Sequence, residues 1–151
     1  MWIDQIAREH DPRSCAIIDH DSTRLSYGAL ETAVDTAATV LRANGVGAGD
    51  RVLLVAENCA QFVVVLLAVA RLRGWCVPVN ARTGAAELDA IIAHAGPRAS
   101  VFTTAASPDA QAHAARLGAV EHAPVAGAAL VLTSDPHAHA EPQDRKPEAQ
   151  V

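Results

Sequence analysis

Residues 49–82, GDRVLLVAENCAQFVVVLLAVARLRGWCVPVNAR, decide the fold class of this 151-residue chain. The apolar run Val52–Ala56 follows two charged residues and predicts a buried strand. A helix opens at Glu57-Asn58, is apolar on nearly every side, and ends at Gly74. A second short strand, Cys76–Val79, then leads to Asn80. Because a helix without a polar face must be covered on several sides, this strand–helix–strand unit predicts a layered α/β domain.

The same alternation of strands and helices continues on both sides of this unit. The sequence predicts, in order, a short N-terminal helix, a hairpin over 15–26, a helix from Ser26 to Asn44 that ends at Gly45, a helix that bears Leu88, Ile91, Ile92 and Ala95 and is stopped by Gly96-Pro97, a strand at 99–103, a helix at 108–117, and short strands at 118–122 and 128–132. Continuously apolar strands that alternate with helices predict a mostly parallel sheet with helices on both faces. We expect residues 1–132 to form this domain. Residues 133–151, which include Pro136, Pro142 and Pro147, are expected to form an exposed linker.

Composition excludes several classes of function. A net charge of -5 and an aromatic content of 3% argue against a nucleic-acid partner. The longest apolar run, Phe62–Ala70, is far shorter than the roughly 20 residues of a spanning helix, so we expect no membrane span. The N-terminus lacks the pattern of a secretory signal, which favours a cytoplasmic protein. Eleven of the twelve basic residues are Arg, a bias typical of a GC-rich bacterial genome.

Three groups of residues carry weak signals of chemistry. Cys15, Cys59 and Cys76 form no Cys-x-x-Cys pair and fall in or beside apolar runs, so we interpret them as small hydrophobes. A nucleophilic role for Cys59 remains an alternative, because a helix N-terminus can lower a thiol pKa. His137 and His139 lie in a Pro-rich segment without further ligand spacing, which favours a solvated linker over a metal site. The glycines of residues 45–49 follow a helix and precede a strand, the reverse of a dinucleotide fingerprint.

Four polar residues follow the two strands of the central unit. Glu57-Asn58 follows the first strand, and Asn80 and Arg82 follow the second. The carboxyl ends of strands are where open α/β sheets gather ligands, and Arg pairs readily with carboxylate or phosphate groups. The alternative for Glu57-Asn58 is capping of the free N–H groups at the start of the helix, and we favour it.

Several short motifs occur in an order that resembles one family. They are Leu25-Ser26-Tyr27-Gly28-Ala29-Leu30, then Gly45-Val46, Gly49-Asp50-Arg51-Val52, Glu57-Asn58, and Gly74-Trp75-Cys76-Val77-Pro78-Val79-Asn80. Together they resemble the early blocks of the adenylate-forming (AMP-binding) superfamily. The resemblance runs from about Ala16 to Ala95, and Val79-Asn80-Ala81-Arg82 is similar to acyl-CoA synthetases in particular.

The resemblance implies an ATP-dependent acid–CoA ligase, which joins a carboxylic acid to ATP and then passes the acyl group to CoA. Such an enzyme uses ATP, Mg and CoA, and holds the phosphates with a Gly/Ser/Thr-rich loop and a lysine. This chain has no glycine after Gly127, and its only lysine, Lys146, lies in no such loop.

We therefore expect an incomplete, N-terminal segment that ends before the phosphate-binding loop. It is expected to hold no catalytic, cofactor-binding or metal-binding residue, to be inactive alone, and to have the remainder of the ligase as its partner. Part of this expectation is that the chain offers few elements to cover the apolar helix at 60–72. The alternative is a naturally short, non-catalytic paralogue that acts as a binding or assembly module.

Overall fold

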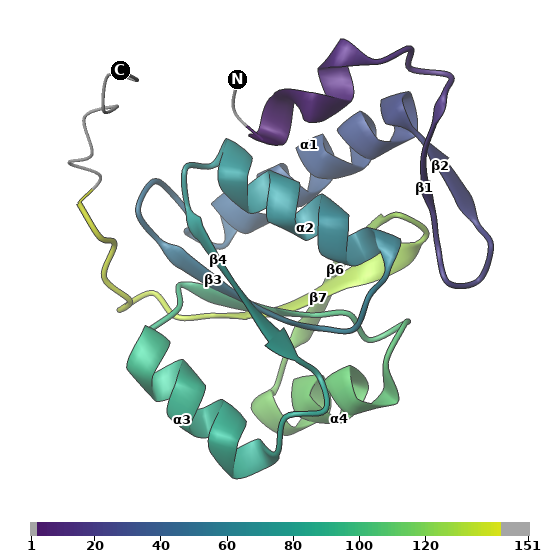
Figure 1. Ribbon diagram of the computed structural model, residues 1–151. Coiled ribbons are helices and arrows are strands. Elements are labelled where there is room, and N and C mark those ends of the chain that lie inside the picture. The colour runs from purple at the N-terminus through teal and green to yellow at the C-terminus, as the bar shows by residue number, and fades with distance from the viewer. Residues whose placement is uncertain (1–2, 143–151) are drawn as a thin grey trace, which may run out of the picture.

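The computed structural model describes residues 3–142, and Figure 1 shows them as a sheet between two layers of helices. The elements follow in the order η1 (Ile3–Glu9, a 3-10 helix), β1 (Cys15–Ile18), β2 (Arg24–Ser26), α1 (Tyr27–Ala43), β3 (Arg51–Ala56), α2 (Ala60–Arg71), β4 (Trp75–Asn80), α3 (Ala85–Ala95), β5 (Ala99–Phe102), α4 (Pro108–Leu117), β6 (Val120–Val125) and β7 (Ala128–Ser134).

β3 is the central strand of the parallel part of the sheet. The strand order is β4-β3-β5-β7-β6, and β3 pairs in parallel with both β4 and β5. Val52 and Leu54 pack into the core beneath α1 and α2, whereas Leu53 and Val55 pack into a second core against α3 and α4. Because alternate side chains of a strand point to opposite faces, burial on both faces requires the unbroken apolar run. The predicted α/β class with helices on both faces is confirmed.

The last two strands make the sheet mixed. β7 pairs antiparallel with β5 on one side and with β6 on the other. The connection between β6 and β7 is a two-residue turn in which Ala126 and Gly127 both have positive φ, 50° and 81°. Such a turn joins antiparallel strands, whereas a parallel pair needs a much longer crossover. The parallel part of the sheet is therefore confined to β4, β3 and β5.

α2 is covered within the chain. It packs against α1, η1 and the sheet, and Val64, Val65, Ala68 and Val69 are fully buried. At the end of the helix, Arg71 binds Glu31 and Asp35 of α1 and the main-chain carbonyl of Asp4 in η1. The expectation that few elements could cover this helix was wrong, because α1 and η1 lie together over its outer side.

β4 forms one edge of the sheet and contains Pro78. The N–H groups of Trp75 and Ala81 donate to carbonyls on the β3 side. Since the direction of the N–H alternates along a strand, the nitrogen of Pro78 faces the open side, and this residue is exposed. A proline at that position removes a donor from the edge and discourages pairing with another chain.

Helix ends follow the sequence closely. Ser26 caps α1, with its Oγ accepting a hydrogen bond of 3.2 Å from Ala29 N, and Gly45 has a φ of +88° after the helix.

The last strand, β7, continues to Ser134, beyond residue 132. Residues 143–151, with Lys146 and Pro147, lie outside the described residues. Among residues 3–142, no helix has the length and apolar character needed to cross a membrane.

Candidate functional site at the carboxyl ends of the parallel strands

The four polar residues predicted to lie at the strand ends meet in one groove. Glu57 and Asn58 follow β3, whereas Asn80 is the last residue of β4, its parallel neighbour, and Arg82 follows that strand. The groove has a volume of about 480 Å³. The residues that line it are Ala56, Glu57, Asn58, Phe62, Pro78, Val79, Asn80 and Arg82. The sequence-based placement of these side chains at one edge of the sheet is therefore correct.

An ion pair spans this groove. Arg82 Nε donates to Glu57 Oε1 at 2.7 Å, and the Arg82 side chain is 75% exposed. Asn80 fixes the turn that carries the arginine, because its Oδ1 accepts a hydrogen bond of 2.9 Å from Arg82 N. An ion pair this exposed contributes little to folding, roughly 0–1 kcal/mol. The Arg82 guanidinium is therefore accessible, and breaking its ion pair with Glu57 to bind an anionic group would cost little free energy.

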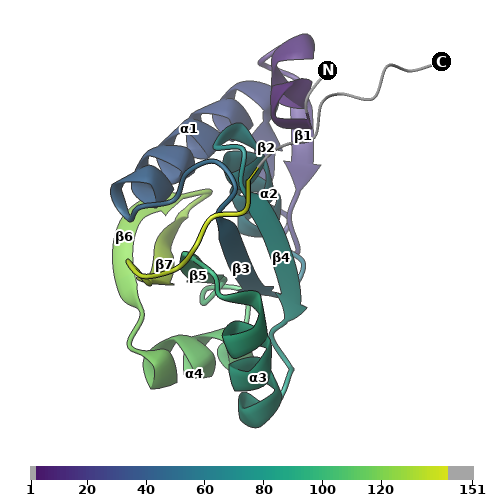
Figure 2. The same ribbon diagram turned by 90° about the vertical axis from the view of Figure 1, so that its left-hand side faces the viewer.

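The chain path makes this a place where a ligand can bind. After β3 the chain passes to α2 on one face of the sheet, and after β4 it passes to α3 on the other face (Figure 2). Helices that diverge from neighbouring parallel strands leave a crevice at the carboxyl edge, and open α/β sheets bind ligands there. The groove offers a carboxylate, a guanidinium and two amides over an apolar floor of Phe62 and Val79.

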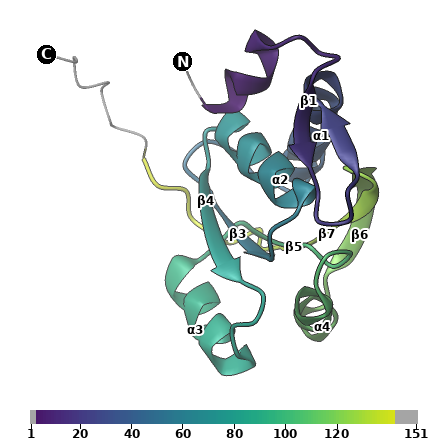
Figure 3. The ribbon, with the colours of Figure 1, turned by 45° about the vertical axis from the view of Figure 1, so that its right-hand side comes forward.

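Capping of α2 comes from a different residue than the sequence indicated. The N-cap position is Cys59, whose side chain makes no capping hydrogen bond. Asp19, at the tip of the β1–β2 hairpin, accepts a hydrogen bond of 3.0 Å from Ala60 N through its Oδ2. Figure 3 shows this hairpin beside α1, with its tip reaching the start of α2. The favoured interpretation of Glu57-Asn58 as the cap is wrong, and Asp19 carries no local signal because it lies 41 residues earlier.

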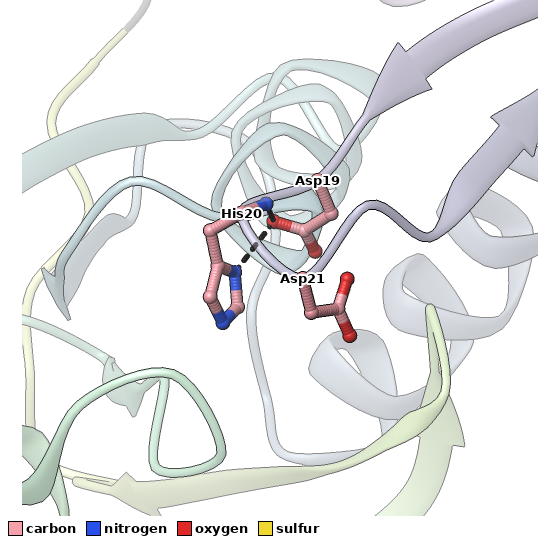
Figure 4. Close-up of side chains that lie close together, drawn as sticks. All are labelled: Asp19, His20 and Asp21. Carbon is pink, nitrogen blue, oxygen red and sulfur yellow. Dashed lines mark hydrogen bonds and ion pairs between the residues drawn. The ribbon is translucent and has the colours of Figure 1, made fainter.

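Asp19 belongs to a cluster with His20 and Asp21 (Figure 4). Their possible metal-ligating atoms lie within 4.8 Å of one another, beside a cavity of about 310 Å³ at the start of α2. The Asp19 carboxylate already accepts from Ala60 N, His20 N and His20 Nδ1, and Asp21 Oδ1 accepts from Thr23 N. These bonds are those of a polar turn that caps a helix, and they account for the cluster.

The hydrogen bonds within the cluster shift its pKa values. The hydrogen bond to Asp19 raises the pKa of His20. For Asp19, burial acts to raise the pKa, but the hydrogen bonds from Ala60 N and His20 outweigh it and lower the pKa. Both shifts favour the charged forms of Asp19 and His20.

The cysteines lack the features of a nucleophile. Cys15 is exposed, and Cys59 and Cys76 are half-buried. Burial raises the pKa of the Cys59 thiol, and it raises the pKa of Cys76 to about 11. The alternative of a Cys59 nucleophile activated by a lowered pKa is therefore wrong, because burial outweighs the effect of the helix start.

The remaining sequence signals have structural roles. The glycines of residues 45–49 lie in the loop from α1 to β3, as expected for an αβ connection, and Gly47 N donates to Asp50 Oδ2. His137 and His139 are exposed, and His137 N donates to Asp135 Oδ1 in a local turn.

Comparison with known proteins identifies a family and several relatives of parts of this chain. The family model described as AMP-binding enzyme matches residues 4–151. The long-chain-fatty-acid–CoA ligase FadD13 of Mycobacterium tuberculosis is 29% identical over 98 residues, which cover 64% of this chain and 20% of that protein. A feruloyl-CoA synthase of an Amycolatopsis species is 35% identical over 86 residues, which cover 57% of this chain and 18% of that protein.

Solved structures of similar fold agree with the family match. The N-terminal domain of FACL13 from Mycobacterium tuberculosis, with a bound inhibitor, superposes with a TM-score of 0.66 at 27% identity. That match covers 74% of this chain and 29% of the other. ATP-bound MatB from Rhodopseudomonas palustris gives a TM-score of 0.64 at 30% identity, covering 83% of this chain and 26% of the other. The chain thus spans about a fifth of the length of these two curated relatives and about a quarter of the solved chains.

Proposed function

The chain belongs to the AMP-binding enzyme family, and from this premise we propose that it forms the N-terminal scaffold of an ATP-dependent acid–CoA ligase. The complete enzyme would convert a carboxylic acid and ATP to an acyl-adenylate and pyrophosphate, and then transfer the acyl group to CoA. The observation that carries the proposal is the family match over residues 4–151, together with the sequence similarity to the CoA ligase FadD13.

The described residues do not fit a triphosphate site. Among those that line the groove, Arg82 is the one cation, and it is paired with Glu57. The chain's only lysine, Lys146, lies outside the described residues. No catalytic step is therefore assigned to this chain, and we propose that ATP, Mg and CoA are held by the remainder of the ligase. In the complete enzyme, the role of the groove would be to present Arg82 to an anionic group of a substrate.

An exchange assay tests this proposal. The purified chain, with its fold verified by circular dichroism, is incubated with ATP, labelled pyrophosphate, Mg²⁺ and a panel of fatty, aromatic and small carboxylic acids. We expect no acid-dependent exchange of label into ATP, whereas FadD13 serves as the positive control of the assay. Acid-dependent exchange by the chain alone would overturn the proposed division of labour.

Two observations favour the alternative, a naturally short binding or assembly module. α2 is covered by α1 and η1 without help from another chain, and Pro78 protects the open edge of β4 from pairing. Both features support a chain that is stable by itself. Size-exclusion chromatography with light scattering tests this point, because a self-standing module elutes as one monodisperse species, whereas rapid aggregation of the purified chain counts against it.

A further inference from the structure

The segment that follows β7 is fastened to the sheet although its composition is that of a linker. From Asp135 the backbone crosses the amino end of β5 and reaches the amino end of β3, as Figure 2 shows in yellow. Asp135 N donates to Arg98 O at 2.8 Å, and Glu141 N donates to Gly49 O at 2.8 Å. Residues 135–141, called the strap below, therefore have main-chain bonds at both ends.

Arg98 holds the first half of the strap with most of its guanidinium. Its Nη1 donates to the carbonyls of Asp135 at 3.0 Å and Pro136 at 2.8 Å, and its Nη2 donates to the carbonyl of Ala138 at 2.5 Å. Nε donates to Asp50 Oδ1 at 3.2 Å. The side chains of Arg98 and Asp50 are only 15% and 5% exposed. A planar group with several N–H donors in a fixed fork makes this set of bonds, which an ammonium on a flexible stem cannot reproduce.

Gly49 contacts the backbone of Glu141 at the end of the strap. Its φ is +81°, and a β-carbon built at this position would overlap the carbonyl oxygen of Glu141. The backbone of the strap thus lies where any other residue would place its side chain. The Glu141 side chain also forms an ion pair with Arg51, the first residue of β3.

We infer that Gly49, Asp50 and Arg98 form a latch that holds residues 135–141 across the amino ends of β5 and β3. β3 lies next to the edge strand β4. The latch therefore holds residues 135–141 at the amino ends of these two strands, and the chain continues from there. The role of this device rests on the proposed function: in a complete ligase it would position everything that follows residue 142. Arg98 is in that sense a positioning residue and not a catalytic one.

Amide hydrogen exchange of the full chain, measured by NMR or by mass spectrometry of peptides, tests the latch. The variants are Gly49→Ala, Arg98→Lys and the control Gly127→Ala. Gly127 has the same φ of +81° with no atom within 4 Å of a built β-carbon, so its substitution carries the same backbone strain without meeting the strap. Peptides from β5 report on the fold of each variant.

In the unmodified chain we expect the amides of Asp135 and Glu141 to exchange more slowly than in an unstructured peptide, by about tenfold or more, as for locally folded surface segments. Gly49→Ala and Arg98→Lys are expected to abolish that protection while β5 stays protected, and Gly127→Ala to retain it. Exchange of the strap at the unstructured rate in the unmodified chain would overturn the inference. Equal strap protection in Gly49→Ala and Gly127→Ala would also overturn it. If Gly49→Ala does not fold, Arg98→Lys decides alone, and unchanged protection there refutes the latch. Because the readout contains no ligase activity, the result is independent of the proposed function.

Discussion

The capping of α2 by Asp19 gives the sharpest stability prediction. Replacing Asp19 by Ala removes the acceptor for Ala60 N at the start of a twelve-residue helix. Loss of a capping side chain costs about 1 kcal/mol. Loss of a negative charge from a helix N-terminus costs about 0.3–1 kcal/mol more. We therefore expect Asp19→Ala to lower the free energy of unfolding by about 1.5 kcal/mol, and Asp19→Asn, which keeps an oxygen acceptor, by less than half of that.

The assay is urea unfolding at pH 7, followed by circular dichroism. Asp21→Ala is the matched control, since Asp21 lies in the same hairpin and carries the same charge, but accepts from Thr23 N and not from α2. The advantage of Asp over Asn has a defined pH dependence. Folding lowers the Asp19 pKa, so this contribution is present above the ordinary value of 3.8 and is lost as the pH falls through the lowered folded pKa. Equal losses in Asp19→Ala and Asp21→Ala would refute the capping role, as would an unchanged stability of Asp19→Ala.

Two further predictions concern the core and the thiols. Leu54 is fully buried in β3, so Leu54→Ala should lower the free energy of unfolding by about 2–5 kcal/mol in the same urea assay. A decrease below about 1 kcal/mol would contradict the central place of Leu54 in the core. At pH 8 a disulfide-exchange reagent should modify the exposed Cys15 well before Cys59 and Cys76, whose raised pKa values keep them as thiols. Above pH 9 the chain should lose stability, because the unfolded state ionises Cys76 at its ordinary value of 9.0 whereas the folded thiol has a pKa of about 11. Rapid modification of all three thiols, or a flat stability from pH 8 to 10, would contradict this.

The parts of the fold that could be predicted are those whose signal is local. The run Val52–Ala56 must be buried on both faces, Ser26 marks the start of α1 by its side-chain oxygen, and Gly45 marks its end by a positive φ. The groove could be predicted for a related reason. Glu57 and Arg82 were each expected after the carboxyl end of a strand, and because these two strands are parallel neighbours the residues come to the same edge of the sheet.

The features that sequence reasoning missed depend on distant partners. Asp19 caps a helix that begins 41 residues later, and Arg98 binds carbonyls 37 to 40 residues further along. Nothing in the neighbourhood of either residue indicates its partner. The antiparallel end of the sheet has a local signal in Ala126-Gly127, but the pairing of β7 with β5 joins residues about 30 positions apart, which no local pattern indicates.

We propose that this chain acts as the N-terminal scaffold of an acid–CoA ligase. The most direct test is the size of the endogenous protein in its source cells, detected with an antibody raised against residues 3–134. If the chain is such a scaffold, we expect a species several times larger than 15.7 kDa, with acid-dependent pyrophosphate exchange in the immunoprecipitate. A species of 15.7 kDa that brings down no such activity would contradict the account and favour the short binding module.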